Sequence, residues 1–335
     1  AIKFFLLGVL SASLILYGFS LIYGLTGQLV FADISAYLLA NSLGSSPVLL
    51  LSAILVISGI GFKISVVPFH SWAPDTYEGA PLPITAYLSV SSKATGFVAL
   101  IVLLTKVFES SGQSWGVILA IVAGATMTLG NLVALQQTNP VRLLAYSSIS
   151  QAGFIIAPLA VSGITGNYQD GIFASVTYLI IYAFMNIGAF LSVHLFTNFT
   201  KSDNFYEWGG IAKHSPLAGV LTTVFFFSLA GIPPLGGWFA KFVVFRSLLS
   251  TGEIIGISLA IVGAINAVIA LVYYARISKV IWMDELKNPE EEKSFEFQSP
   301  LKVVGALTVL ITFVAGIFPG IFSYLGEVSS IFFGN

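Results

Sequence analysis

The apolar residues of this chain fill long continuous windows, and they neither alternate with polar residues nor keep to one helical stripe. About 20 consecutive apolar residues suffice for a helix to cross the hydrocarbon core of a bilayer. Strands of a membrane barrel would alternate between lipid-facing and lumen-facing residues, and that pattern is absent from the sequence. We therefore predict an all-α polytopic membrane protein with about nine transmembrane helices. The windows are 3–24, 47–68, 82–107, 115–136, 141–162, 172–197, 216–250, 254–283 and 301–325.

Composition excludes several classes of protein. Of the 335 residues, 56% are hydrophobic and 9% are charged, against roughly 25% charged in soluble domains. The net charge of −1 and the lack of a Lys/Arg cluster argue against a nucleic-acid partner. Without cysteine the chain offers no thiolate metal site, Cys-ligated cluster or Cys nucleophile. The three histidines, at 70, 194 and 214, match no metal or haem pattern, so we expect neither metal nor cofactor on this chain.

The basic residues in the predicted loops are divided unequally between the two sides of the membrane. The side on which the chain starts collects nine of them and the opposite side two. The positive-inside rule then places the first side, with the 284–299 loop, in the cytoplasm. Because the chain begins without Met inside an apolar run, we also expect a piece of a longer protein. The nine are Lys3, Arg142, Lys201, Lys213, Arg276, Lys279, Lys287, Lys293 and Lys302, and the two are Lys106 and Arg246.

Three further lysines, Lys63, Lys93 and Lys241, lie inside the apolar windows. A lysine at the bilayer centre costs about 2.5 to 3.5 kcal/mol on insertion scales, so three of them indicate an ion path. A desolvated lysine can load and release a proton, which arginine cannot. The alternative is that each amine reaches an interface or is satisfied by a helix-end carbonyl.

Glycines and prolines beside two of these lysines predict interrupted helices. In transporters such interruptions mark the two halves of an inverted repeat, although simple proline kinks are the alternative. The residues expected to break the helices are Gly59, Gly61 and Pro68 around Lys63, and Pro233, Pro234 and Gly236 before Lys241.

Other polar groups near the lysines could extend a proton relay. His70 could pass protons between the first broken helix and the loop that carries Asp75 and Glu78, or it could only cap a helix end. All fifteen Asp and Glu residues fall in loops or near span ends. The sequence therefore shows no carboxylate partner for the lysines at mid-membrane depth.

Three long motifs carry a family resemblance. They are GFKISVVPFHSWAPDTYEGAPLPITAYLSVSSK from Gly61, RLLAYSSISQAGF from Arg142 and GIPPLGGWFAKF from Gly231. In this order they resemble the subunit N (subunit 2) branch of the antiporter-like subunits of respiratory complex I, which includes the equivalent chain of the photosynthetic NAD(P)H dehydrogenase-like complex. The resemblance covers nearly the whole chain.

The resemblance implies a fourteen-helix fold with two inverted five-helix repeats and discontinuous helices. This chain would start at family helix six, so that 1–108 completes the first repeat, 114–283 forms the second and 284–335 holds the loop and last helix. Lys63, Lys93 and Lys241 would match the lysines of helices seven, eight and twelve. The glutamate that pairs with the helix-seven lysine would lie upstream of Ala1.

The function implied by the resemblance is proton translocation through these lysines in a membrane subunit of NADH (or NAD(P)H):quinone oxidoreductase. NADH, FMN, iron–sulfur clusters and quinone would then belong to partner subunits. The expected neighbours are another antiporter-like subunit, a small K-type subunit and lipids, in a bacterial inner membrane or a thylakoid or other organelle membrane. A subunit of a multi-subunit Na⁺/H⁺ antiporter or of a membrane-bound hydrogenase, and a purely structural anchor, remain the alternatives.

Overall fold

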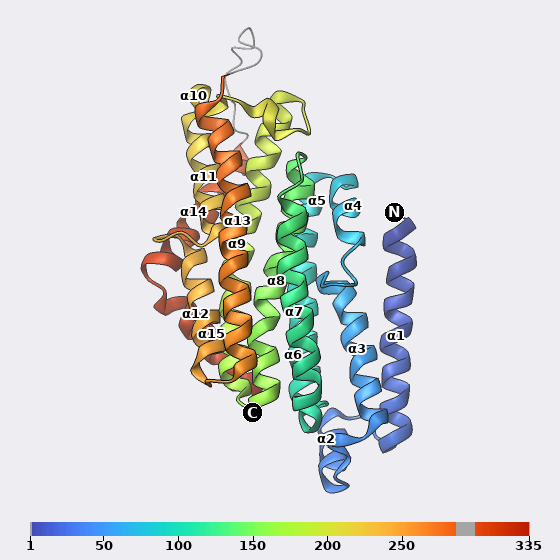
Figure 1. The fold of residues 1–335 in the computed structure, drawn as a ribbon. Coiled ribbons are helices and arrows are strands. Elements are labelled where there is room, and N and C mark those ends of the chain that lie inside the picture. Colours follow the sequence, from blue (N-terminus) through green and yellow to red (C-terminus); the bar gives the residue numbers. More distant parts are fainter. Residues whose placement is uncertain (1, 286–298, 335) are drawn as a thin grey trace.

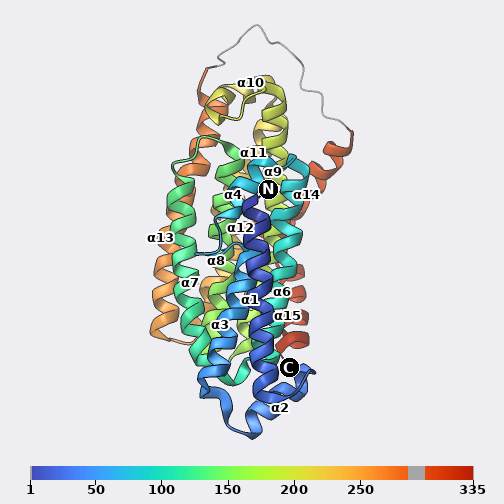
Figure 2. The ribbon, with the colours of Figure 1, turned by 90° about the vertical axis from the view of Figure 1, so that its right-hand side faces the viewer.

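The structure, a computed structural model, describes residues 2–285 and 299–334. These residues form a tall bundle of roughly parallel helices, shown from two sides in Figure 1 and Figure 2, and contain no strand. The predicted all-α class is confirmed. The helices are α1 (Ile2–Thr26), α2 (Phe31–Ala40), α3 (Pro47–Ile64), α4 (Trp72–Gly79), α5 (Leu82–Tyr87), α6 (Lys93–Lys106), α7 (Gly112–Ala134), α8 (Pro140–Thr165), α9 (Tyr168–Thr200), α10 (Ile211–His214), α11 (Pro216–Ala230), α12 (Gly236–Ser250), α13 (Ile254–Met283), α14 (Ser299–Ile317) and α15 (Gly320–Gly334).

The predicted membrane spans agree with these helices. Eight stretches of the described chain are long and apolar enough to cross a membrane. The remaining predicted window, 216–250, holds α11 and α12 in series. The N-terminus, α4 and α10 lie toward one end of the bundle, and α2 and the C-terminus toward the other (Figure 1). Most of the 284–299 loop falls outside the described residues.

The first interruption follows α3, where residues 65–71 leave the helix before α4 begins. Pro68 lies in this interruption as predicted. Gly59 and Gly61 do not, because α3 continues through both of them to Ile64. At Gly59 a Cβ atom would come 2.7 Å from the Ser11 carbonyl oxygen of α1. That glycine therefore permits close helix packing and does not break the helix.

The second interruption is the 231–235 segment between α11 and α12, at the predicted paired prolines. Gly231 has a φ of 94°, a conformation that favours glycine because it has no Cβ. Gly236 is not part of the break, because it is the first residue of α12.

A third interruption was not predicted. The window 301–325 was expected to be one helix, but α14 ends at Ile317 and α15 begins at Gly320, with Pro319 between them. Proline removes a helical hydrogen bond, which explains the end of α14. The indole Nε1 of Trp238 in α12 donates to the Gly316 carbonyl at 3.1 Å. The second and third interruptions therefore lie against each other.

The centre of the bundle is α8, whose residues are buried on nearly all sides between α7, α9, α12 and α13. By contrast α1 lies on the outer face of the bundle, in front of α3, and exposes most of its residues (Figure 2). Polar residues of α8 therefore face other helices of this chain.

Candidate functional site

Lys93 is the most deeply buried charged side chain of the described residues, with 1% of its surface exposed. It begins α6, directly after the π-helical turn Leu88–Ser92. Its amine donates to the Ser148 hydroxyl at 2.6 Å and to the Ser148 carbonyl at 2.9 Å. Both partners are neutral oxygens of α8. The predicted burial of Lys93 inside a span is confirmed, and its amine has no carboxylate partner in the described part of the chain.

Several polar atoms around Lys93 lack hydrogen-bond partners. Tyr77 of α4 and Tyr182 of α9 lie beside Ser148 and are fully buried. Neither hydroxyl makes a hydrogen bond of good geometry with another described residue. The side-chain amide of Asn186 donates at 2.8 Å to the hydroxyl of Ser89, which lies one turn before Lys93. The side-chain oxygen of Asn186 is unpaired. Buried polar atoms normally bind protein groups or ordered water, so this cluster suits water-mediated contacts.

Lys241 is 5% exposed and lies on α12, just past the second interruption. Its amine donates to the carbonyl of Ala230, the last residue of α11. The amine also lies 5.4 Å from the centre of the Phe154 ring of α8. A helix-end carbonyl was the alternative explanation for these lysines, and Lys241 does make this contact. The interruption thus supplies the oxygen that holds the buried amine.

Gln151 of α8 connects the surroundings of the two lysines. It lies one turn after Ser148, and its side-chain oxygen accepts a hydrogen bond from the Tyr178 hydroxyl. Its amide donates to the Leu229 carbonyl at 3.3 Å. Leu229 directly precedes Ala230, the partner of Lys241. Buried polar atoms on or against α8 therefore lie near both lysines, at Ser148 beside Lys93 and at Gln151 near the residues that hold Lys241.

A side branch of this polar set leads between α7 and α13. Ser147 of α8 shares a hydrogen bond with Tyr274 of α13, whose neighbour Tyr273 donates to Asn131 at 2.9 Å. Asn131 in turn donates to the Asn266 side-chain oxygen at 3.0 Å. Sequence reasoning missed the tyrosines, because a tyrosine in an apolar window is commonly an interface anchor. The asparagines in the windows were a signal that could have been used.

Lys63 stays a predicted member of the proton path. Its side chain is exposed, although its stem contacts α6, where a Cβ at Gly96 would lie 3.1 Å from Lys63 Cγ. The reason is that α3 lies at the outer side of the bundle, with α1 and α6 as its main neighbours. Gly96 is one turn from Lys93, so the stem of Lys63 packs on α6 one turn after Lys93.

His70 and the nearby acids lie at the end of the bundle that carries α4. His70 is half-buried in the first interruption, and its Nδ1 has no hydrogen-bond partner in the described chain. Asp75 pairs with Lys3 and, at 3.0 Å, with Arg142, which also bonds Glu78 at 2.6 Å. The Lys3 hydrogen bond, aided by Arg142, holds the pKa of Asp75 below its usual value. The relay through His70 stays a prediction.

The described residues offer no site for a metal ion. Within 2–285 and 299–334, no three His, Asp or Glu side chains gather closely enough to hold a metal ion. The site is therefore a set of lysines, hydroxyls, amides and carbonyls, which can carry protons through hydrogen bonds.

Comparison with known proteins agrees with this arrangement. Residues 1–269 match the family model described as NADH:quinone oxidoreductase/Mrp antiporter, transmembrane. The chain belongs to this family. It is 37% identical to NADH-quinone oxidoreductase subunit N of Desulforamulus reducens, over 95% of this chain and 64% of that protein. It is 42% identical to NAD(P)H-quinone oxidoreductase subunit 2 of Crocosphaera subtropica, over 95% of this chain and 61% of that protein.

A solved structure also shares the fold. A chain of respiratory complex I from Thermus thermophilus is 27% identical and superposes with a TM-score of 0.76, covering 96% of this chain and 67% of its own length. The present chain thus spans just under two thirds of the length of the two relatives above. These matches support the predicted resemblance to the subunit N branch of antiporter-like membrane subunits.

Proposed function

We propose that this chain translocates protons as part of an N-type membrane subunit of an NADH (or NAD(P)H):quinone oxidoreductase. The observation that carries the proposal is the pair of buried lysines, Lys93 and Lys241, with the polar residues Ser148 and Gln151 of α8 near them. A buried lysine is costly in a membrane protein and typically marks a proton or ion path. A structural anchor would not need two of them.

The proposed transfer starts at Lys93. Its amine bonds only neutral oxygens of Ser148 and has no carboxylate partner among the described residues, and a lysine, unlike an arginine, can release its proton. Ordered water between the unpaired hydroxyls and Gln151 would carry the proton along α8. Lys241 would accept it beside the second interruption. The two proline-containing breaks would then give access from the two sides of the membrane.

The exposed Lys63 has a modulating role in this proposal. Its stem packs on α6 one turn from Lys93, and its amine faces outward. The positive charges of Lys63 and Lys93 disfavour each other. A negative charge that a neighbouring helix or subunit places beside Lys63 would offset this effect and so change the proton affinity of Lys93. Lys63 therefore offers a route by which a partner could control proton loading.

The redox chemistry of the proposed enzyme would take place in other subunits, where NADH, flavin, iron–sulfur clusters and quinone are expected. The isolated chain should then carry no absorbing cofactor. We propose the end with α4 and α10 as the cytoplasmic side, on the charge distribution. Neighbours would be a second antiporter-like subunit and a small K-type subunit.

The experiment that tests the function is a substitution in the assembled complex of the source organism. Lys93→Gln keeps a polar side chain but removes the titratable amine. Proton uptake by inverted vesicles during NADH oxidation should fall to the level seen when NADH oxidation drives no pumping. The matched control is Lys279→Gln, an exposed lysine of α13, which should pump normally. Normal pumping by Lys93→Gln, or transport that requires Na⁺, would contradict the proposal.

A further inference from the structure

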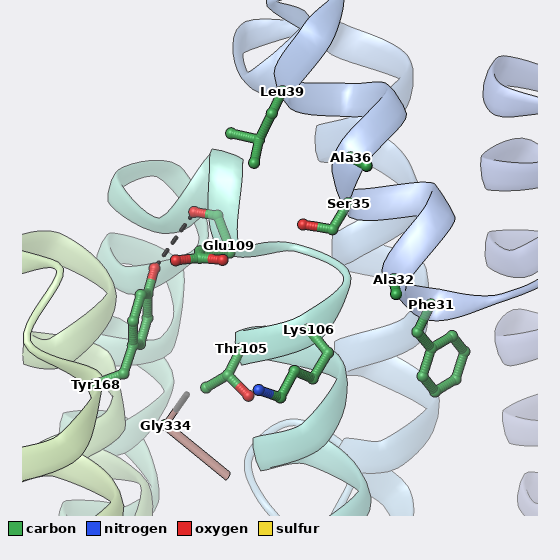
Figure 3. Close-up of a pocket in the computed structure, with 10 residues that line it drawn as sticks. All are labelled: Phe31, Ala32, Ser35, Ala36, Leu39, Thr105, Lys106, Glu109, Tyr168 and Gly334. Atoms are coloured by element: carbon green, nitrogen blue, oxygen red, sulfur yellow. Dashed lines mark hydrogen bonds between the residues drawn. The ribbon is translucent and has the colours of Figure 1, made fainter. Parts of the chain in front are cut away.

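A hollow away from Lys93 and Lys241 lies between α2, the end of α6 and the start of α9 (Figure 3). Its volume is about 580 Å³, within the roughly 300–1,000 Å³ of small-molecule sites. Ser35 of α2 points across the hollow toward Glu109, and Lys106 extends below them. The lining residues are Phe31, Ala32, Ser35, Ala36, Leu39, Thr105, Lys106, Glu109, Tyr168 and Gly334.

The position of the hollow matches the depth of lipid headgroups. One membrane span ends at Lys106, the next begins at Glu109, and a third begins at Tyr168. Charged and tyrosine side chains at span ends mark the interface between hydrocarbon and water. The short helix α2 exposes Phe31 and Leu39 beside the hollow. A short helix with exposed apolar residues at this depth is typical of an interfacial segment.

The charges of the hollow are balanced but unpaired. Lys106 is half-buried, Glu109 is exposed, and no ion pair joins the two within the described residues. The Tyr168 hydroxyl donates to the Glu109 backbone carbonyl at 3.3 Å, and the Glu109 carboxylate lines the hollow on the side of that hydroxyl (Figure 3). A ligand that fits must therefore offer a negative group to Lys106 and a positive group to Glu109.

We propose that this hollow binds the headgroup of a zwitterionic phospholipid with a primary ammonium, namely phosphatidylethanolamine. The phosphate lies against the Lys106 amine, and the ammonium donates hydrogen bonds to the Glu109 carboxylate. The acyl chains follow the apolar side of α2 at Phe31 and Leu39. Charge-assisted hydrogen bonds of this kind are about twice as strong as neutral ones.

The same residues select against other lipids. An anionic headgroup such as phosphatidylglycerol would meet the Glu109 carboxylate without a compensating cation. The choline of phosphatidylcholine has no N–H group to donate to that carboxylate. The order of affinity should therefore be phosphatidylethanolamine, then phosphatidylcholine, then phosphatidylglycerol.

Photolabelling of the assembled complex tests this site. The delipidated complex is incubated with photoactivatable phosphatidylethanolamine, phosphatidylcholine or phosphatidylglycerol, and the labelled peptides are mapped by mass spectrometry. Phosphatidylethanolamine should label peptides containing 31–39 and 105–109. Lys106→Met should reduce this labelling about tenfold, the effect expected for one charge-assisted hydrogen bond. Glu109→Gln should reduce it to the level of phosphatidylcholine.

A matched control is Glu253→Gln, because Glu253 is exposed in the loop between α12 and α13, which lies at the same end of the bundle as α2 (Figure 1) but does not line the hollow. Its labelling should equal that of the wild-type complex. Unchanged labelling in Lys106→Met would overturn the site. Stronger labelling by phosphatidylglycerol would show an anionic-lipid site and overturn the assigned headgroup. Absence of lipid label at these peptides would overturn the lipid site.

Discussion

Replacing Gly231 by alanine should displace Lys241 without replacing any titratable residue. Gly231 has a φ of 94°, and an added Cβ would lie 2.8 Å from Lys241 Cδ and 3.3 Å from its amine. The Cδ contact is at least half an ångström shorter than an ordinary contact of 3.4 Å. The lysine stem must therefore move away from the Ala230 carbonyl. Alanine at positive φ also costs about 1–2 kcal/mol in backbone strain.

Gly252→Ala provides the matched control for strain. Gly252 also has a positive φ, of 69°, but nothing lies within 4 Å of its would-be Cβ. Both variants should therefore lower thermal stability by about 1–2 kcal/mol. Only Gly231→Ala should change proton transfer, because misplacement of a reacting group by about 1 Å can cost a factor of ~100.

The assay compares the two variants in assembled complexes reconstituted into liposomes. Proton uptake, followed with a pH-sensitive dye, is divided by the NADH oxidised. We expect Gly252→Ala to keep the wild-type ratio and Gly231→Ala to lose at least about tenfold. Equal ratios in the two variants would show that the position of the Lys241 amine does not matter for transfer, and would refute the reasoning.

Three further perturbations test separate parts of the structure. Gln151→Leu removes the side-chain hydrogen bonds of Gln151 with Tyr178 and Leu229 and should stop pumping. The free energy of unfolding should fall by about 1–3 kcal/mol, measured by thermal unfolding. Tyr274→Phe deletes the bond to Ser147 on the side branch, so pumping should continue, and lost pumping would place the branch in the path. Asp75 has a lowered pKa, so its ion pairs stabilise the fold above its ordinary pKa and are lost as pH falls through the lowered value. Asp75→Asn should remove this acid dependence, with an effect below about 1 kcal/mol in pH-dependent melting.

The sequence was sufficient to predict the helical membrane class, the spans and two of the three interruptions. Long apolar windows leave a helix as the only structure that satisfies the backbone in lipid, and paired prolines remove helical donors. The third interruption was missed because a single Pro319 near a span end is compatible with a continuous helix. Its role appears only where Gly316 packs against the Pro234 segment.

The candidate site was predicted in part for a similar reason. Lysines in apolar windows stand out at any position, so Lys93 and Lys241 were found directly. Burial depends on which helix faces the centre, and the sequence does not reveal this for nearly uniform apolar windows. Lys63 was predicted to lie inside a span near its end, and within the described residues its side chain is exposed on α3. The tyrosines beside Ser148 were missed for the same reason.

The most direct test of the central claim compares Lys93→Arg with Lys93→Ala in the assembled complex. Arginine keeps the positive charge but cannot release a proton in a protein. If Lys93 passes its proton along α8, neither variant should pump protons during NADH oxidation. If the lysine only supports the structure, Lys93→Arg should preserve function and Lys93→Ala should impair assembly. Proton pumping by Lys93→Arg at the wild-type rate would contradict the account.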